Sequence, residues 1–141
     1  MTSLRPFTQP WADALRHAIN GDDAYRAAAR GWTWPIALVL DAAPEFGYHA
    51  ETAVQFELDR GDCTGVRVVE PAAITAPFVL RAPYAVWKRI VRGVTDPVMA
   101  VALRQVSLQG SLSTLMSHAG AAKALIACAR RVPTHFPDET A

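Results

Sequence analysis

The histidines and cysteines of this chain are few and far apart in the sequence. The four histidines fall in different predicted elements, without the His-x-x-x-His or His-x-Glu spacing that would bring two metal ligands onto one face. Cys63 and Cys128 lack the close spacing of a zinc site and are interpreted as small buried hydrophobic residues. The sequence therefore predicts no metal and no cofactor.

Signatures of covalent and nucleotide chemistry are also missing. The serines near position 111 belong to no Gly-x-Ser-x-Gly elbow. Gly61 and Gly65 fall around a predicted hairpin, not in a Gly-rich turn from a strand into a helix, where phosphates bind. These patterns argue against a serine nucleophile and a nucleotide site, and we assign no catalytic residues.

Three side chains remain as candidates for acid/base chemistry. Asp41 ends the first predicted strand, Tyr84 lies near the start of a helix, and His118 lies on the last helix. An isomerase or cyclase would need one of them to face an apolar pocket with a shifted pKa. Their structural interpretations are a turn-forming aspartate, a tyrosine at the core edge and a hydrogen-bonded histidine. A small enzyme therefore stays as an alternative.

Length and composition indicate one globular unit. The chain has 141 residues, of which 51% are hydrophobic and 19% charged, so we expect a single domain spanning 1–141 with its core over about 7–131 and a loosely held polar tail at 132–141. The 14 basic and 13 acidic residues nearly cancel, which argues against nucleic acid as a partner. The longest aliphatic run, 36–40, is too short to span a bilayer and no signal region opens the chain. We expect a cytoplasmic protein with at most transient membrane contact.

Hydrophobic periodicity predicts an α+β fold. A spacing of three to four residues predicts helices at about 9–20, 22–30, 84–93, 97–103 and 112–131. A period of two predicts strands at 32–40, 54–58, 66–69, 78–82 and 106–109. One face of most strands is apolar and the other is polar, so we expect helices on one face of the sheet and water on the other. On the polar face, Val39 and Val79 could seed contact with a protein partner or a second copy, which is a further alternative.

Large apolar side chains gather on the helix-facing side of the predicted sheet. They could interdigitate as a closed core. Several of the covering helices are short and rich in alanine, however, and small side chains would leave space beneath them. A hydrocarbon entering such a space would gain about 0.8 kcal/mol per buried methylene. Composition leaves both possibilities open.

The segment 87–112 carries a distinctive order of short motifs. A helix bearing Trp87 is followed by Gly93, an Asp96-Pro97 helix start, and the run Val106-Ser107-Leu108-Gln109-Gly110-Ser111-Leu112 before a long helix. This order, with the elements before it, resembles the sterol carrier protein type 2 family of non-specific lipid-transfer or sterol-binding domains over about residues 7–131. The chain departs from the family pattern at Arg104-Gln105, where Gly-Lys is frequent, and at Ser111, where an acidic residue is usual.

The resemblance implies a five-stranded sheet with helices packed on one face and an apolar cavity between the layers. It implies that fatty acids, acyl-CoA or sterol-like lipids are bound or transferred there without catalysis. Carried over by position, the ligand-binding residues are Trp34, Ile36, Phe56, Phe78, Leu80, Trp87, Ile90, Leu112, Leu115 and Met116. The predicted partner is therefore a lipid or another hydrophobic small molecule, and a homodimer remains an option.

Overall fold

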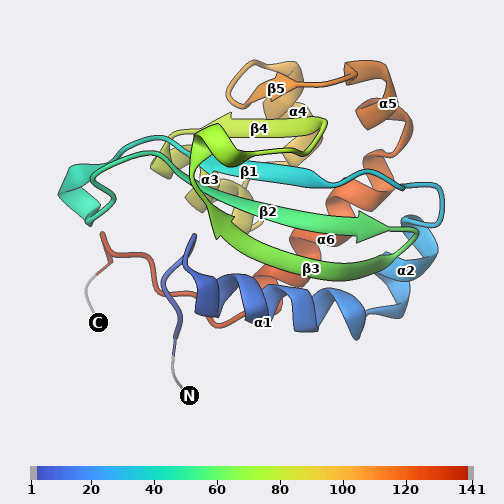
Figure 1. The fold of residues 1–141 in the computed structure, drawn as a ribbon, viewed down its shortest axis with the longest axis horizontal. Coiled ribbons are helices and arrows are strands. Elements are labelled where there is room, and N and C mark those ends of the chain that lie inside the picture. Colours follow the sequence, from blue (N-terminus) through green and yellow to red (C-terminus); the bar gives the residue numbers. More distant parts are fainter. Residues whose placement is uncertain (1–2, 140–141) are drawn as a thin grey trace.

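A five-stranded mixed sheet forms the centre of the molecule (Figure 1). The computed structural model describes residues 3–139. The strands are β1 (Ile36–Leu40), β2 (Thr52–Asp59), β3 (Asp62–Val69), β4 (Phe78–Ala82) and β5 (Ser107–Gln109), in the order β3-β2-β1-β4-β5. β1 runs parallel to β4, and the other neighbours are antiparallel. The predicted α+β class with one open five-stranded sheet is confirmed.

Helices cover one face of this sheet, with α6 crossing it diagonally and α1 following β3 (Figure 1). The helices are α1 (Gln9–Asn20), α2 (Asp23–Ala28), α3 (Tyr84–Val91), α4 (Pro97–Ala102), α5 (Leu112–Ser117) and α6 (Ala119–Arg131). Short side chains accept hydrogen bonds from the first turns of four of them, namely Thr8, Asp22, Asp96 and Ser111. None of the helices within residues 3–139 is both long and apolar enough to span a bilayer.

The middle of the opposite face of the sheet is also covered, which corrects in part the expectation that this face meets water; Arg67, Ser107 and Gln109 on the same face are exposed. Residues 70–77, here called the crossover segment, join β3 to β4 and include a 3-10 turn at Pro71–Ala73. Val39 and Val79 are buried on this face together with small alanine side chains. They are therefore not exposed as the predicted seeds of a protein contact. The cause is topological: β3 and β4 lie on either side of β2 and β1, so their connection must cross the sheet, and the helices occupy the other face.

Gln55 fixes the crossover segment to the sheet. Its side-chain oxygen accepts hydrogen bonds from the backbone N–H groups of Thr75 (3.0 Å) and Ala76 (3.2 Å). Its side-chain nitrogen donates to Glu57 Oε1 (2.8 Å) and Thr75 Oγ1 (2.9 Å). Both acceptor and both donor positions of this amide are thus used, and the side chain is only 1% exposed. Alternation predicted a water-facing glutamine here, and the structure shows a buried one.

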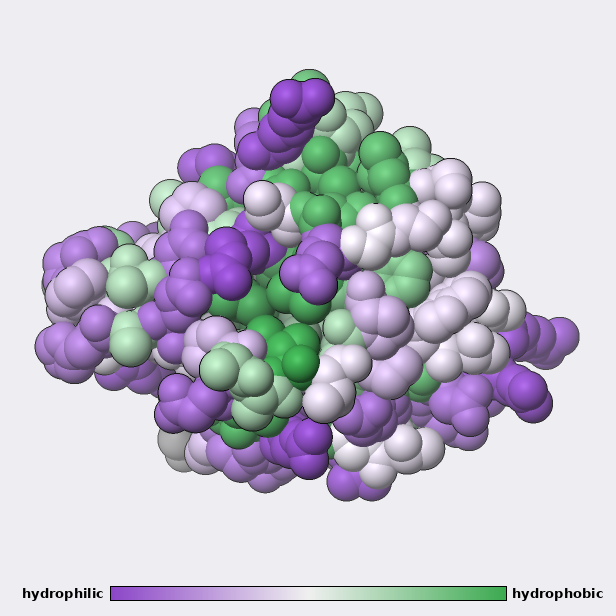
Figure 2. Space-filling view, turned by 45° about the horizontal axis from the view of Figure 1, so that its top comes forward, coloured by the Kyte–Doolittle hydropathy of each residue, from purple (hydrophilic) through white to green (hydrophobic). Residues whose placement is uncertain are grey.

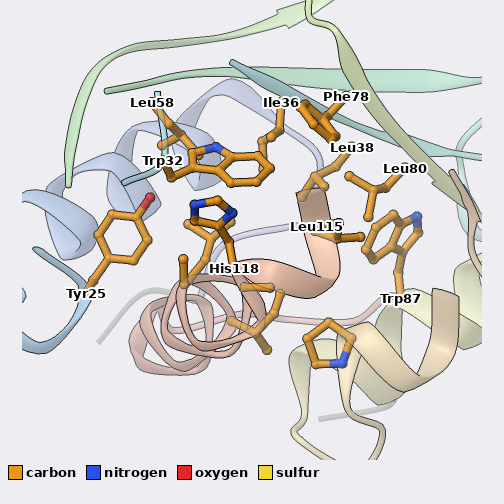
Figure 3. Close-up of a pocket in the computed structure, with 15 residues that line it drawn as sticks. Tyr25, Trp32, Ile36, Leu38, Leu58, Phe78, Leu80, Trp87, Leu115 and His118 are labelled. Carbon is orange, nitrogen blue, oxygen red and sulfur yellow. The ribbon is translucent and has the colours of Figure 1, made fainter. Parts of the chain in front are cut away.

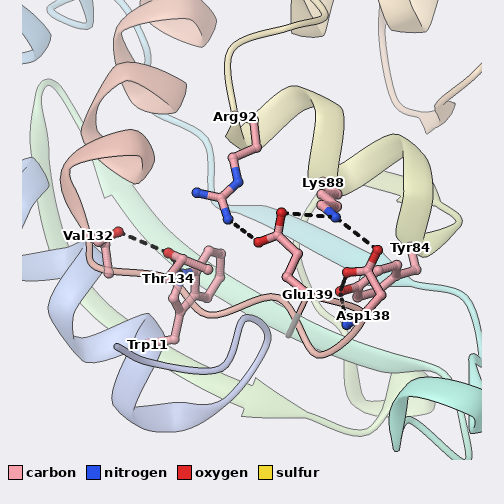
Figure 4. A network of polar contacts seen from close by, with 8 residues as sticks. All are labelled: Trp11, Tyr84, Lys88, Arg92, Val132, Thr134, Asp138 and Glu139. Carbon is pink, nitrogen blue, oxygen red and sulfur yellow. Dashed lines mark hydrogen bonds and ion pairs between the residues drawn. The ribbon is translucent and has the colours of Figure 1, made fainter. Parts of the chain in front are cut away.

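The C-terminal segment packs against the body up to residue 139, contrary to the predicted loose tail (Figure 4). Phe136 is buried against the ring of Tyr84. Asp138 accepts a hydrogen bond from the Tyr84 hydroxyl (2.6 Å) and pairs with Lys88 Nζ (2.8 Å). Residues 132–139 therefore extend the core beyond the predicted limit at 131, because Phe136 gives this polar segment an apolar anchor. Residues 140–141 of the predicted tail lie outside the described part of the chain.

Candidate functional site

An apolar pocket lies between the sheet and the helices (Figure 3). The space that a water-sized molecule can occupy in it is about 60 Å³. It is lined by Tyr25, Trp32, Ile36, Leu38, Leu58, Phe78, Leu80, Trp87, Pro97, Leu115, His118, Ala121, Ala122, Leu125 and Ile126. No lysine, arginine or carboxylate belongs to this lining, so the pocket offers a surface suited to hydrocarbon.

Strand pairing builds the floor of the pocket. Ile36 pairs with Phe78 and Leu38 with Leu80 across the parallel strands β1 and β4, so all four side chains point to the same face. Leu58 extends this floor from β2. The period of two that predicted the strands therefore also sets the apolar face of the site.

A break at His118 shapes the roof. The sequence predicts one helix over 112–131, but the structure divides it into α5 and α6. The His118 ring nitrogen Nδ1 lies 2.9 Å from the Thr114 carbonyl, while the His118 backbone N–H turns to Leu115 (3.1 Å). Ser117 Oγ likewise donates to the Ser113 carbonyl (2.9 Å). The His118 side chain thus takes the Thr114 carbonyl, which a continuous helix would give to the His118 backbone N–H, and α5 ends there.

The side chains of α5 differ in their access to the pocket. Leu115 is 6% exposed and lines it, whereas Leu112 and Met116 are 49% and 47% exposed. Their helical spacing predicts one buried stripe, but Leu115 alone of the three is buried.

The structure places five of the ten predicted binding residues in the pocket lining: Ile36, Phe78, Leu80, Trp87 and Leu115. The other five lie outside it. Phe56 and Ile90 are fully buried elsewhere in the core, Leu112 and Met116 face outward, and Trp34 packs edge-on against Trp32 with their ring centres 5.0 Å apart. Only Leu58 reaches the pocket from β2, because the pocket lies over β1 and β4. This position explains why Phe56 does not line it.

Several lining residues were not among the predicted ones. Leu38 and Leu58 carry a usable signal, because each lies two residues from a predicted one on the same strand face. Tyr25 and Pro97 come from other helices, and only the tertiary arrangement brings them to the pocket. The lining residues of α6 follow helical spacing, but their orientation depends on the unpredicted break at His118.

Solved structures of known proteins resemble this fold closely. A crystal structure of sterol carrier protein 2 is 33% identical over 91% of this chain and 99% of that chain, with a TM-score of 0.86. The solution structure of a conserved hypothetical protein from Thermus thermophilus, described as possibly a sterol carrier protein, is 32% identical over 96% of this chain and 94% of that one, with a TM-score of 0.87. The chain belongs to the sterol carrier protein 2 family.

The likeness within the sterol carrier protein 2 family extends to more distant members as a fold. The apo form of sterol carrier protein 2 from Yarrowia lipolytica is 14% identical over 84% of this chain and 88% of that one, with a TM-score of 0.57. No protein-family model matches the sequence, and no curated protein matches it. The two solved structures with about one third sequence identity confirm the predicted resemblance to this family.

The three acid/base candidates have different positions in this sterol carrier protein 2 fold. Asp41 lies outside the pocket lining, with its carboxylate 4.0 Å from Arg81. Tyr84 also lies outside it, and its hydroxyl donates to Asp138. His118 does line the pocket, and the centre of its ring lies 5.3 Å from the ring centre of Trp32. One candidate of the three therefore has access to the site.

Exposed apolar side chains lie on two helices that also supply the lining of the pocket. Met99 and Leu103, in and directly after α4, are 55% and 62% exposed, and they accompany the outward-facing Leu112 and Met116 of α5. Figure 2 shows apolar surface gathered on the part of the molecule that carries α4, β5 and α5 in Figure 1. The segment 97–137 contains no aspartate or glutamate. The segment that carries these exposed apolar side chains therefore contains no acidic residue of its own.

Proposed function

We propose that this chain binds a hydrophobic small molecule, such as a fatty acid, an acyl-CoA or a sterol-like lipid, and carries it without covalent chemistry. The observation that carries the proposal is the apolar pocket between the sheet and α5 and α6. Membership of the sterol carrier protein 2 family supports the same class of ligand. The pocket lining provides hydrocarbon contacts on every side and no cation or carboxylate.

The size of the pocket sets a condition on binding. Its roughly 60 Å³ exceeds the 10–15 Å³ or so that one water needs, but it is small for a whole lipid. Binding of a long chain therefore requires the roof to move outward. The short helix α5 is the part of the roof best suited to move, because it has one turn and a half and ends at the break at His118.

Two observations support the accompanying expectation of transient membrane contact. Met99, Leu103, Leu112 and Met116 are exposed on helices that also supply lining residues. The acid-free segment that carries them suits the negative surface of an anionic bilayer. We propose that a lipid enters and leaves on this side.

Filling the pocket tests the proposal. In Leu115→Trp the larger side chain should occupy the pocket and weaken binding of a fluorescent fatty acid at least about tenfold, or 1.4 kcal/mol. Its free energy of unfolding should change by less than the 1–3 kcal/mol or so that overpacking a closed core costs. Fluorescence titration and chemical denaturation measure the two effects.

The neighbouring residue provides a matched control. Met116→Trp adds the same side chain at an exposed position one residue away, and both affinity and stability should stay near the wild-type values. Lost stability with unchanged binding in Leu115→Trp would contradict the proposal, as would an absence of binding to the wild-type protein across chain lengths. Native mass spectrometry of the purified protein would show a co-purifying lipid directly.

A further inference from the structure

Tyr25 carries a buried hydroxyl that has no hydrogen-bond partner among residues 3–139. The residue is 1% exposed and lines the pocket. Within the described chain, every side-chain nitrogen or oxygen that is fully shut off from open space has a hydrogen-bond partner. The Tyr25 hydroxyl is therefore in contact with open space, and Figure 3 shows it turned toward the pocket beside Leu58 and Trp32.

The other buried tyrosines are different. The Tyr48 hydroxyl donates to the Pro6 carbonyl (2.6 Å) and the Tyr84 hydroxyl to Asp138 (2.6 Å), and neither residue lines the pocket. Leaving a buried hydroxyl unpaired costs about 1–3 kcal/mol. The missing hydrogen-bond partner of the Tyr25 hydroxyl therefore goes with its place in the pocket, since the buried tyrosines outside the pocket are paired.

The remaining polar atoms of the pocket are already engaged or directed elsewhere. The indole N–H of Trp32 donates to the Trp34 carbonyl (2.7 Å), and that of Trp87 to the Val39 carbonyl (2.9 Å). His118 uses Nδ1 on Thr114. Its Nε2 faces Gly31, where an added Cβ would lie 3.3 Å away. Two lining groups thus have no hydrogen-bond partner among residues 3–139, the Tyr25 hydroxyl and His118 Nε2, and the latter lies against the Gly31 backbone.

We infer that the Tyr25 hydroxyl is the inner polar anchor of the pocket and forms a hydrogen bond with a neutral oxygen of the ligand, such as a hydroxyl, carbonyl or ester oxygen. This inference rests on the proposed function and makes its ligand class more specific. The ligand then enters with this oxygen directed toward Tyr25 and its hydrocarbon over the floor of β1 and β4. A phenol both donates and accepts, so each of these oxygens can pair with it.

A carboxylate is the wrong partner at this position. The pocket lining contains no lysine or arginine to balance a negative charge, and transfer of an unpaired carboxylate from water into an apolar site is strongly unfavourable. Burial is the main cause that raises the pKa of Tyr25 above its ordinary value. The nearby Cys63 and Cys128 side chains raise this pKa further, by smaller amounts. The same environment therefore disfavours negative charge on the protein and on the ligand.

Three probes with the same chain length separate the contributions of hydrocarbon, neutral oxygen and charge. Heptane, 1-heptanol and heptanoate at pH 7 are titrated against the wild-type protein and Tyr25→Phe, and binding is followed by the fluorescence of the lining residues Trp32 and Trp87. The wild-type protein should bind 1-heptanol at least about tenfold more tightly than heptanoate. Tyr25→Phe should weaken 1-heptanol about five- to tenfold, since it removes one hydrogen bond, and should leave heptane unchanged.

A second tyrosine serves as the control. Tyr48→Phe also removes one hydroxyl, but from a residue outside the pocket, so it should lower stability and leave the affinity for all three probes unchanged. Tyr25→Phe should be as stable as the wild type, because no hydrogen bond within the protein is lost.

The outcomes separate the inference from the proposed function. If heptane binds to the wild-type protein, two results overturn the anchor while the apolar site stands. In the first, Tyr25→Phe leaves the affinities for heptane and 1-heptanol unchanged; in the second, it changes these two affinities equally. Binding of heptanoate as tight as that of 1-heptanol also overturns the anchor. If the wild-type protein binds none of the three probes, nor the fluorescent fatty acid, the proposed function itself fails.

Discussion

The two faces of the sheet bury apolar residues under different covers. On the helix side, large groups such as Trp32, Phe78 and Trp87 surround a pocket of about 60 Å³. On the opposite side, small residues such as Ala37 and Ala53 are 0% exposed beneath the crossover segment. Large, rigid side chains under a broken helix leave space, whereas small ones under a short loop allow the backbone to approach closely. The face with the larger side chains is thus the one with room for a ligand.

The two faces also differ in their polar groups. Gln55 makes four hydrogen bonds on the crossover side and has no capacity left. On the helix side, the Tyr25 hydroxyl makes none with any residue from 3 to 139. A satisfied polar residue stabilises the fold, and an unsatisfied one next to a pocket is available to a ligand. This contrast predicts that substitutions on the two faces have separable effects on stability and binding.

We expect the largest effect on stability from removing the hydrogen bonds that Gln55 makes with the crossover segment. Gln55→Leu keeps a similar volume but leaves the buried N–H of Ala76 and the part-buried N–H of Thr75 without their acceptor. At about 1–3 kcal/mol for the buried unpaired group and about 0.5–1.5 kcal/mol for the other lost hydrogen bond, the free energy of unfolding should fall by roughly 2–4 kcal/mol. The affinity of the folded protein for a lipid should stay the same. Denaturant titration, with binding measured well below the transition, checks both.

The register partner of Gln55 provides the control for that measurement. Arg67 on β3 pairs with Gln55 and is exposed, so Arg67→Leu should change stability by less than about 0.5 kcal/mol. Equal losses in the two variants would show that the effect arises from general changes to the sheet surface and not from the buried amide.

The same enlargement on both faces sharpens the comparison. Ala53 is 0% exposed on the crossover side, and Ala121 is 6% exposed and lines the pocket. Ala53→Leu should lower the free energy of unfolding by about 1–3 kcal/mol, because a close-packed site must distort to accept the larger side chain. Ala121→Leu should cost much less, since the pocket provides room. Thermal denaturation of the two variants measures the difference, and equal costs would mean that the pocket behaves as a closed core.

The smallest expected effect concerns pH and the C-terminal segment on the helix side. Hydrogen bonds from Lys88 and then Tyr84 hold the pKa of Asp138 below its ordinary value of 3.8. The hydrogen bond to Asp138 in turn raises the pKa of Lys88 above 10.5. The stabilisation from Asp138 is therefore present above pH 3.8 and lost as the pH falls through its lower folded value. That from Lys88 is present below pH 10.5 and lost as the pH rises through its higher folded value.

Replacing the carboxylate tests this pH dependence. The melting temperature of Asp138→Asn should lie slightly below that of the wild type from about pH 5 to pH 9, and the gap should close on acidification below 3.8. The affinity for a lipid should not change, because none of these residues lines the pocket. A gap that widens in acid would contradict the assigned direction of the Asp138 pKa.

The sheet and much of the pocket floor could be predicted from the sequence, because strand alternation is a local signal. Ile36, Phe78 and Leu80 follow directly from it. The roof could not be predicted in the same way. Whether His118 bonds to Thr114 depends on the rotamer and backbone geometry of one residue, and helical spacing alone does not tell which of Leu115 and Met116 faces inward.

The burial of Gln55 shows a second limit of prediction from sequence patterns. A glutamine that alternates with apolar residues is typical of a strand with one face in water. The crossover segment covers the part of that face around Gln55 because of the strand order, which is a property of the whole chain. The buried Phe136 near the C-terminus is similar, since a single aromatic residue in a polar stretch gives no periodic signal.

The four bonds of Gln55 also determine how β2 can align with its neighbours. If β2 slipped by one residue, the side chain that now lies beneath Thr75 and Ala76 would point into the helix layer, and Val54 or Phe56 would meet those two N–H groups instead. Neither hydrocarbon can accept a hydrogen bond. A single amide therefore disfavours misaligned versions of the sheet, and the apolar floor on the other face depends on that alignment.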